Sequence, residues 1–251
     1  MCLVAFAIDV HPKYRLVLIS NRDERFDRPA APLARWADAP AVVAGRDLDA
    51  GGTWLGVAEH GRWAVLTNVR DPQNPRDPIR SRGCLAADFL TGSASASGYA
   101  ERVFDSRGDY DGFNLVVGDL DGVFVVSTHT DHIAELGRGV YGLSNAQLDT
   151  SWPKVVRTRT ALRSALEAST DAPEDLLPLL DDTRQAPDDD LPDTGVGLRW
   201  ERLLSPVRIV TEGYGTRAST VVLLDRAGLG TLTEQTWLPV GEAGRLTQIQ
   251  L

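Results

Sequence analysis

Cysteine, lysine and histidine are scarce in this chain of 251 residues. Its two cysteines, Cys2 and Cys84, cannot form a disulfide framework, and they cannot complete a four-ligand zinc site without help from the four histidines. Lys13 and Lys154 are the only lysines, and the other 24 of the 26 basic residues are arginine. The composition therefore excludes disulfide-rich scaffolds and cysteine-based zinc domains.

Positive charge is also in short supply. The formal net charge is −9 and the sequence pI is about 4.9. A surface that binds nucleic acid needs clustered lysine and arginine, so we expect no nucleic-acid partner. The hydrophobic fraction of 43% and the charged fraction of 24% are those of an ordinary globular protein. Since no linker divides the chain, we expect one domain over residues 1–251.

Long apolar runs are missing as well. The first apolar run, residues 2–8, is short, has no basic segment before it and is followed at once by Asp9. A secretory signal needs a charged start and a longer apolar core, and a membrane helix needs about 20 apolar residues. We therefore expect a cytoplasmic protein without a membrane span, whose two thiols stay reduced.

Turn residues divide the chain into short apolar runs, which predict the order of its elements. The predicted strands are residues 3–8, 16–19, 41–44, 53–58, 63–68, 113–117, 123–128, 133–136, 140–143, 207–211, 219–224 and 231–236. The predicted helices are residues 81–90, 99–104, 151–168 and 174–180, with Ser81 and Ser151 as N-caps, and residues 29–40 are predicted as a loop. This order is typical of an α+β protein in which antiparallel sheets carry helices on their outer faces.

Cys2 is the first residue whose position indicates chemistry. A small second residue normally allows removal of Met1, which leaves a thiol and a free α-amine on one residue. The unperturbed pKa values are about 7.7–8.0 for the amine and about 8.5 for the thiol, so the amine can act as base for its own nucleophile. The alternative is structural, because a cysteine that opens a buried strand usually belongs to the core. We expect Cys84, in the first predicted helix, to be such a core residue.

The tetrapeptide Asn21-Arg22-Asp23-Glu24 directly follows the second predicted strand. A hairpin that turns at residues 11–13 pairs residues whose numbers add up to about 24, which predicts Arg22 opposite Cys2. A guanidinium beside a thiol favours the thiolate and lowers its pKa. The alternative is a solvated run of charges at the end of a strand.

Motifs along the whole chain resemble those of one family. In order they are Met1-Cys2, Asn21-Arg22-Asp23-Glu24, Gly51-Gly52-Thr53-Trp54-Leu55-Gly56, Leu66-Thr67-Asn68, Arg80-Ser81-Arg82-Gly83, Phe113-Asn114-Leu115-Val116-Val117-Gly118-Asp119, Gly142-Leu143-Ser144-Asn145 and Gly215-Thr216-Arg217-Ala218-Ser219-Thr220. Each motif alone is unspecific, but their order resembles the NRDE family, also called the transport and Golgi organisation protein 2 family. Its members resemble N-terminal nucleophile hydrolases. The resemblance implies a four-layer αββα sandwich of two antiparallel sheets with helices on the outer faces.

The resemblance also implies roles for a set of polar residues: Cys2, Arg22, Asp23, Asn68, Asn145 and Arg217. Cys2 would attack an amide carbonyl, and Arg22 would support its thiolate. Asp23 is the nearest match to an aspartate that binds the α-amine, although its spacing from the arginine differs from that of the hydrolases. The two asparagines would hold the nucleophile and contribute to the oxyanion hole, and Arg217 would complete the site.

The residues alone leave other roles open. Asn68 also suits a turn, Asn145 a helix cap and Arg217 an exposed loop. The glycines before Trp54 predict a tight turn with a packed tryptophan rather than a phosphate-binding loop, because the Lys-Ser/Thr of a P-loop is missing.

For the substrate we expect a pocket lined by Trp54, Phe26 and the loops of residues 26–36 and 188–197. Metal binding is not predicted, because histidines three apart at a strand end, His129 and His132, point to opposite faces. The acidic runs at residues 181–182 and 188–190 are more typical of solvated loops than of cation sites.

Two functions follow from the resemblance. The first is a cysteine amidohydrolase of the N-terminal nucleophile type that acts on a linear amide of an acylated small molecule and needs no cofactor. The alternative is a non-catalytic protein on the same fold that binds or transports haem or a lipid, because eukaryotic relatives are associated with haem movement and lipid metabolism. No feature of the sequence indicates an oligomeric state.

Overall fold

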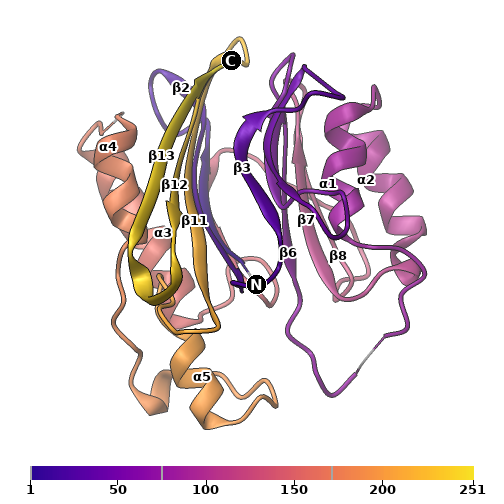
Figure 1. The fold of residues 1–251 in the computed structure, drawn as a ribbon. Helices are drawn as coiled ribbons and strands as arrows, with labels where there is room; N and C mark the ends of the chain where they lie inside the picture. The colour runs from indigo at the N-terminus through magenta and orange to yellow at the C-terminus, as the bar shows by residue number, and fades with distance from the viewer. Residues whose placement is uncertain (1, 75, 171) are drawn as a thin grey trace.

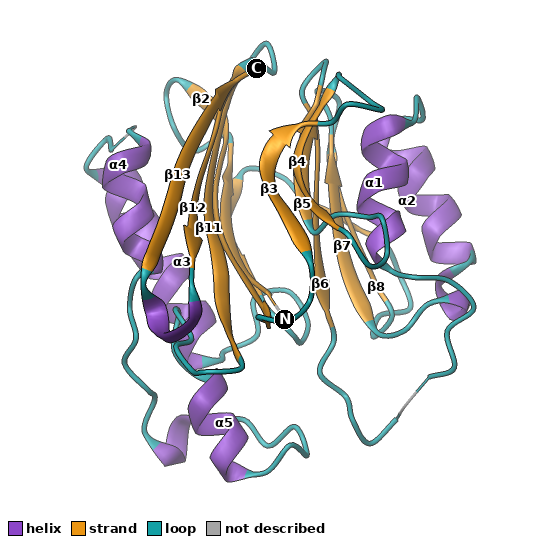
Figure 2. Cartoon of the chain, viewed as in Figure 1, coloured by secondary structure: helices purple, strands orange, loops and turns teal. Residues whose placement is uncertain are grey.

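The computed structural model describes residues 2–74, 76–170 and 172–251. Two antiparallel sheets lie face to face, and helices cover the outer face of each sheet (Figures 1 and 2). The expectation of an α+β protein with a four-layer αββα sandwich is therefore confirmed.

The first sheet carries the N-terminal strand and the C-terminal strand. In spatial order its strands are β10 (Gly139–Leu143), β1 (Cys2–Ile8), β2 (Tyr14–Arg25), β11 (Tyr214–Asp225), β12 (Gly230–Trp237) and β13 (Ala243–Gln250). Helices α3 (Pro153–Glu167) and α4 (Pro173–Leu176), followed by a 3₁₀ turn at Leu177–Leu180, cover its outer face (Figure 1). A 3₁₀ turn at Asp188–Asp190 and the short helix α5 (Leu198–Leu204) lie below one end of this sheet, and a further 3₁₀ turn, Pro239–Gly241, joins β12 to β13.

The second sheet is built from the middle of the chain. Its strands follow sequence order: β3 (Ala30–Arg35), β4 (Val42–Asp47), β5 (Leu55–Ala58), β6 (Arg62–Asn68), β7 (Phe113–Gly118), β8 (Val123–Ser127) and β9 (Ala134–Glu135). Helices α1 (Gly83–Thr91) and α2 (Ala96–Asp105) cover its outer face, and a 3₁₀ turn follows at Arg107–Asp109.

Strand β1 contributes to two cores because both of its faces are covered. Val4 and Phe6 pack between the sheets, where the Phe6 and Trp63 rings meet edge to face with centroids 6.0 Å apart. Leu3 and Ala5 pack on the opposite face, in the core beneath α3. A strand that is buried on both faces is a continuous apolar run, as seen in the sequence. By the same alternation, Cys2 points between the sheets.

Strand β2 is longer than the predicted strand of residues 16–19. It continues to Arg25 and pairs on both sides, with β1 and with β11. Its polar residues are tolerated because they find buried partners: Asn21 Nδ2 donates to the carbonyls of Leu180 (3.0 Å) and Val207 (2.8 Å). The expectation that the tetrapeptide follows the strand is therefore wrong, and Asn21, Arg22 and Asp23 are buried rather than solvated.

Other predicted elements are wrong where a proline or a contact with a distant segment determines the local secondary structure. Residues 29–40 contain β3, an edge strand that tolerates proline because it pairs with only one of the described strands, β4. Residues 207–211 form no strand, because Ile209 N donates to the Thr216 hydroxyl (2.9 Å) and Arg208 N to the Asp182 carbonyl (2.9 Å). Neither α5 nor β13 was predicted.

The predicted helix caps are also wrong. Helix α3 begins at Pro153, so the residue before it, Trp152, is the N-cap instead of Ser151. Helix α1 begins at Gly83, and the Ser81 hydroxyl accepts from Gly83 N (3.3 Å) in the turn before the helix. Cys84 is only partly buried, so it is not the core residue that we expected.

Candidate active site

Cys2 and Arg22 lie opposite each other at the end of the β1–β2 hairpin, as the turn spacing predicts. Cross-strand partners point to the same face of a sheet, here the face toward the second sheet. The guanidinium carbon of Arg22 lies 3.9 Å from the Trp54 ring centroid, and its Nη2 lies 3.8 Å from Asp47 Oδ2. These contacts hold the guanidinium on the thiol's side of the sheet and away from solvent.

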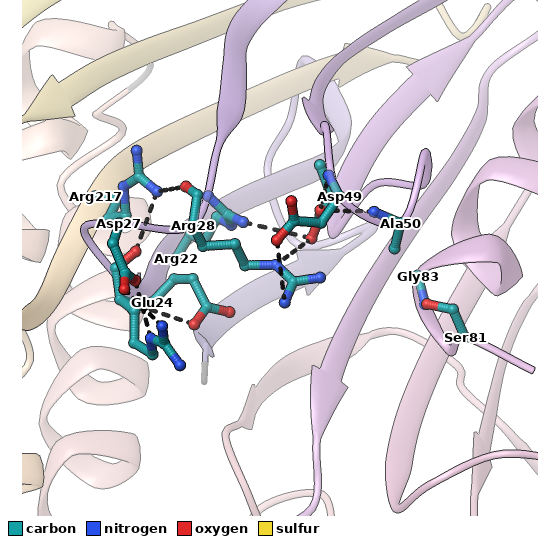
Figure 3. A network of polar contacts seen from close by, with 11 residues as sticks. Arg22, Glu24, Asp27, Arg28, Asp49, Ala50, Ser81, Gly83 and Arg217 are labelled. Carbon is teal, nitrogen blue, oxygen red and sulfur yellow. Dashed lines mark hydrogen bonds and ion pairs between the residues drawn. The ribbon is translucent and has the colours of Figure 1, made fainter.

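Cys2 opens onto a pocket of about 240 Å³ that both sheets line. The described residues around it are Cys2, Arg22, Asp23, Glu24, Arg28, Asp47, Thr53, Trp54, Leu66, Asn68, Pro78, Arg80, Ser81, Arg82, Gly83 and Asp111. Figure 3 shows part of its rim, with Arg22 and Arg28 on one side and Ser81 and Gly83 on the other. Four arginines and four carboxylates balance in this lining, so the pocket is polar without a strong charge of one sign.

The pocket wall before α1 is held tightly against the turn before β5. Thr53 N donates to the carbonyl of Gly83 (3.1 Å), and a Cβ on Gly52 would lie 2.2 Å from that same oxygen. Position 52 therefore requires glycine. The predicted tight turn with a packed tryptophan is confirmed, because a Cβ on Gly45 would lie 2.4 Å from the Trp54 ring.

Cys2 is a buried residue, 7% exposed. Burial raises the pKa of the Cys2 thiol above its ordinary value, and the Asp23 and Glu24 carboxylates act in the same direction, whereas Arg22 opposes them. Since the thiolate is the nucleophile, a thiol with a raised pKa needs a base beside it. The geometry thus positions the sulfur, but another group must remove the thiol proton.

Asp23 comes next on β2 and, by alternation, points toward the side of the sheet covered by α3. Its Oδ1 accepts from the Thr216 hydroxyl (2.7 Å), and the Tyr214 hydroxyl donates to its carbonyl (3.3 Å). Burial raises the pKa of the Asp23 carboxyl, while Lys154 opposes this most strongly and Arg70 adds to that opposition. The protonation state of the Asp23 carboxyl therefore depends on the nearby cations Lys154 and Arg70.

Asn68 and Asn145 form a hydrogen-bonded pair, of which only Asn68 borders the pocket among the described lining residues. Asn145 Nδ2 donates to the Asn68 carbonyl (3.0 Å) and to Asn68 Oδ1 (3.1 Å). The Ser144 hydroxyl lies 2.9 Å from the Cys2 carbonyl and 3.1 Å from Asn145 Oδ1. Because Oδ1 of Asn68 is already bonded, its Nδ2 is the amide donor that can serve the pocket. Asn145, which is fully buried, lies one step behind it.

Arg217 lies at the rim, outside the described lining of the pocket. Figure 3 shows Arg217 beside Arg28, whose carbonyl accepts from Arg217 Nη1. The same Nη1 donates to the Arg25 carbonyl (3.2 Å), and the guanidinium lies 5.9 Å from the Phe26 ring centroid. Arg217 and Phe26 thus brace the segment that carries Arg28, which itself borders the pocket.

The predicted lining is only partly matched by the described residues. Trp54 and Arg28 border the pocket, but the segment of residues 188–197 does not. Pro192, Asp193 and Thr194 of that segment instead border a separate, more open pocket of about 470 Å³ beside Asn145.

Sequence reasoning missed the residues that support the site from distant strands. Thr216 bonds the Asp23 carboxyl, and Ser144 bonds the Cys2 carbonyl. Both lie within motifs that resemble those of the family, residues 142–145 and 215–220, but neither was expected to have a role, because their partners lie far along the chain. Lys154 did carry a signal, as one of two lysines in an arginine-rich chain.

Two properties of the described residues bear on ligands and membranes. They contain no group of three or more His, Cys, Asp or Glu side chains arranged to hold a metal ion. His129 Nε2 lies 3.6 Å from Asp71 Oδ2, and His132 Nδ1 lies 3.0 Å from Asp131 Oδ1. None of the described helices combines the length and apolarity needed to cross a membrane.

Solved structures share this fold. A mutant of the conjugated bile acid hydrolase from Clostridium perfringens matches 100% of this chain and 92% of its own, with a TM-score of 0.59 and 9% identity. A second variant of that hydrolase matches 98% of this chain and 92% of its own, with a TM-score of 0.56 and 9% identity. At this identity the likeness is one of fold: two antiparallel sheets lie face to face, with helices on the outer faces.

Curated relatives are similar over nearly the whole chain. The human Transport and Golgi organization protein 2 homolog is 34% identical over 265 residues, and the mouse homolog is 32% identical over 266 residues; each match covers 95% of this chain and 94% of the relative. The Drosophila melanogaster protein of the same name is 29% identical over 265 residues, covering 94% of this chain and 92% of the relative. The family description Transport and Golgi organisation 2 matches residues 1–239. The chain belongs to the Transport and Golgi organisation 2 family.

Proposed function

We propose that this protein is an N-terminal cysteine hydrolase that cleaves a linear amide of an acylated small molecule. The observation that carries the proposal is the meeting of Cys2, Arg22 and Asn68 at one pocket. They provide a sulfur, a guanidinium on the same sheet face and an amide donor for an oxyanion. Because burial raises the pKa of the Cys2 thiol, the proposed reaction requires a base, and that base in our proposal is the free α-amine of Cys2 itself.

Removal of Met1 precedes the reaction and frees the α-amine of Cys2. The α-amine of Cys2 takes the thiol proton, and Sγ attacks the amide carbon while Arg22 stabilises the thiolate. Asn68 Nδ2 donates to the oxyanion of the tetrahedral intermediate. The ammonium then returns its proton to the leaving nitrogen, and the amine product departs from a thioester. Water, deprotonated by the same amine, hydrolyses the thioester to a carboxylic acid and restores the thiol.

The pocket limits what the substrate presents to Cys2. Its volume of about 240 Å³ is below the ~300–1,000 Å³ that enclose a drug-sized ligand. Leu66, Trp54 and Pro78 contribute apolar surface, and most of the other lining residues are charged or polar. A short acyl group with a polar end fits this lining, with the amine part of the substrate left outside.

Two measurements test the proposal. Intact-mass analysis of the natively expressed protein should show loss of Met1, since a retained Met1 turns the required amine into an amide and rules out this mechanism. Alkylation with a chloroacetamide near pH 7 should label Cys2 about ten times faster than Cys84, with Cys84→Ala unaffected and Cys2→Ala nearly inert. Equal, slow labelling of both thiols contradicts an activated nucleophile.

A substrate screen then tests the reaction itself. Incubation with a panel of N-acyl amines, followed by mass spectrometry, should release equal amounts of acid and amine. Cys2→Ala should abolish release and Cys84→Ala should preserve it. Turnover that survives in Cys2→Ala places the reaction elsewhere.

A further inference from the structure

Lys154 is a buried cation that the reaction above does not use. It lies in the first turn of α3, directly after Pro153, and its side chain is 2% exposed. Its Nζ makes no hydrogen bond with any residue in the described part of the chain. Burying an ammonium without hydrogen bonds costs free energy, so we expect negative charges nearby that stabilise it.

Charged groups from several elements surround Lys154. Asp23 on β2, Cys2 on β1 and Glu201 on α5 favour its ammonium form, whereas Arg70, after β6, disfavours it. Arg70 Nη1 is already paired with Glu201 Oε2 at 2.9 Å, and both side chains are buried. Glu201 is thus engaged with Arg70, and its effect on Lys154 is smaller than that of Arg70. The carboxylate that remains for Lys154 among the described groups is therefore Asp23.

The coupling between Lys154 and Asp23 is mutual. Asp23 is the strongest influence favouring the Lys154 ammonium, and Lys154 is the strongest influence favouring the Asp23 carboxylate. The Tyr214 hydroxyl bonds the Asp23 backbone, and its pKa is raised well above the usual value by burial and by the charges of Asp23 and Cys2. Tyr214 thus stays neutral and does not compete as a charge.

We propose that Lys154 is a positioning residue of the Cys2 site, whose ammonium keeps Asp23 ionised so that Asp23 can hold the α-amine of Cys2. The amine lies at the start of β1, and Asp23 lies one residue beyond the cross-strand partner of Cys2. Lys154 reaches the reacting atoms only through Asp23. This inference rests on the proposed function, since an α-amine on Cys2 exists only after Met1 is removed.

The charge of Lys154 is finely balanced. Burial lowers the pKa of Lys154 to about 8, and Asp23 acts against that lowering. The ammonium therefore persists at neutral pH and is lost as the pH rises through about 8. We expect Cys2 reactivity to depend on Lys154 most clearly between about pH 6 and pH 8.

The scarcity of lysine permits a direct test of the coupling. Protein carrying isotope-labelled lysine should give two side-chain NMR signals, from Lys13 and Lys154, which Lys13→Arg assigns. The Lys154 signal should titrate near pH 8, and Asp23→Asn should lower its midpoint by about one pH unit or more. Glu24→Gln is the matched control, because this adjacent carboxylate lies on the opposite face of β2. An unchanged midpoint in Asp23→Asn, or equal shifts in both variants, overturns the proposal.

Alkylation of Cys2 tests the consequence for the site. Lys154→Met should slow chloroacetamide labelling of Cys2 at pH 7 by about tenfold and move its pH midpoint, because loss of the ammonium raises the pKa of Asp23 and weakens its hold on the amine. Lys154→Arg keeps the charge and should retain the wild-type midpoint, even if its melting temperature falls. A purely structural lysine predicts lower melting temperatures in both variants with an unchanged midpoint.

The two arms separate this inference from the proposed function. If wild-type Cys2 labels no faster than Cys84, the proposed function fails, whereas the NMR coupling is measured without any activity. If Lys154→Met does not fold, the Lys154 titration in wild type and Asp23→Asn still decides the coupling. If Asp23→Asn does not fold, a carboxyl titration of Asp23 in Lys154→Arg and Lys154→Met decides it from the other side.

Discussion

At the scale of single residues, the direction of the hydrogen bonds gives Asn68 and Asn145 different roles, although the sequence predicts the same roles for both. Asn145 gives its Nδ2 to Asn68, and Asn68 receives that donor on its own oxygens. Only Asn68 then has an amide donor for a ligand in the pocket. Asn145 fixes the orientation of the Asn68 side chain by donating two hydrogen bonds to Asn68.

Substitution of the two asparagines should reveal this order. Asn68→Ala should lower kcat/KM on any amide that the wild type hydrolyses by about 10²–10³-fold, the usual effect of losing an oxyanion donor. Asn145→Ala should lower it less, and it should also reduce the free energy of unfolding by about 1–3 kcal/mol, because it leaves buried groups unpaired. The double variant should be no slower than Asn68→Ala alone. Effects on kcat/KM that simply multiply would mean that the two residues act independently.

The sequence predicts those residue contacts that are local. Arg22 could be placed opposite Cys2 because a short turn fixes the register of a hairpin. Thr216 and Lys154 could not be placed beside Asp23, since β11 and α3 come together with β2 only in the folded sheet. The roles of Cys2, Arg22, Asp23, Asn68, Asn145 and Arg217 remain predictions that the experiments above address.

At the scale of elements, β2 shows why a charged tetrapeptide can lie inside a sheet. Asn21 bonds three separate segments: the Leu180 carbonyl after α4, the Val207 carbonyl before β11 and the Ser219 hydroxyl on β11. These bonds exist only once the chain has folded around β2. A pattern of apolar residues therefore predicts too early an end for this strand, and it predicts a strand at residues 207–211 where buried apolar residues lie in an irregular segment.

Asn21 should accordingly be a stability residue. Asn21→Ala leaves two buried carbonyls and one hydroxyl without their partner, and we expect a loss of about 2–4 kcal/mol in the free energy of unfolding. Asn74→Ala is the matched control, because Asn74 is exposed and its amide bonds only the side chain of Asp71 among the described residues. Urea denaturation at pH 7 measures both variants. A loss below about 0.5 kcal/mol for Asn21→Ala would show that water replaces these bonds at little cost.

At the scale of the whole molecule, the two sheets are joined by more than apolar packing. Glu234 of β12 reaches across to β3, where its Oε1 accepts from Leu33 N (2.7 Å). At the same edge, Arg35 Nη2 donates to the Gln250 carbonyl of β13 (2.9 Å). Figure 1 shows β3 facing the strands β12 and β13 across the interface between the sheets. Glu234 is 2% exposed, so this contact places a titratable group inside the sandwich.

The pH dependence of stability should report on that contact. Burial raises the pKa of Glu234 above its ordinary value, against the opposing effects of Leu33 N and Arg22. A carboxyl with a raised pKa in the folded state binds its proton more tightly there. Its favourable contribution is therefore complete below the unfolded-state pKa of about 4.3 and is lost as the pH rises through the folded-state value.

Glu234→Gln keeps the oxygen that accepts from Leu33 N but removes the titration. We expect the variant to gain stability relative to wild type between pH 5 and pH 8 and to match it near pH 4, where both side chains are neutral. Urea denaturation across this range measures the difference, in which the other titrating groups cancel. Glu242→Gln, at an exposed position, is the control for the loss of one carboxylate. If the wild type instead gains stability relative to the variant as the pH rises, the charged form of Glu234, stabilised electrostatically by Arg22, is the form that joins the sheets.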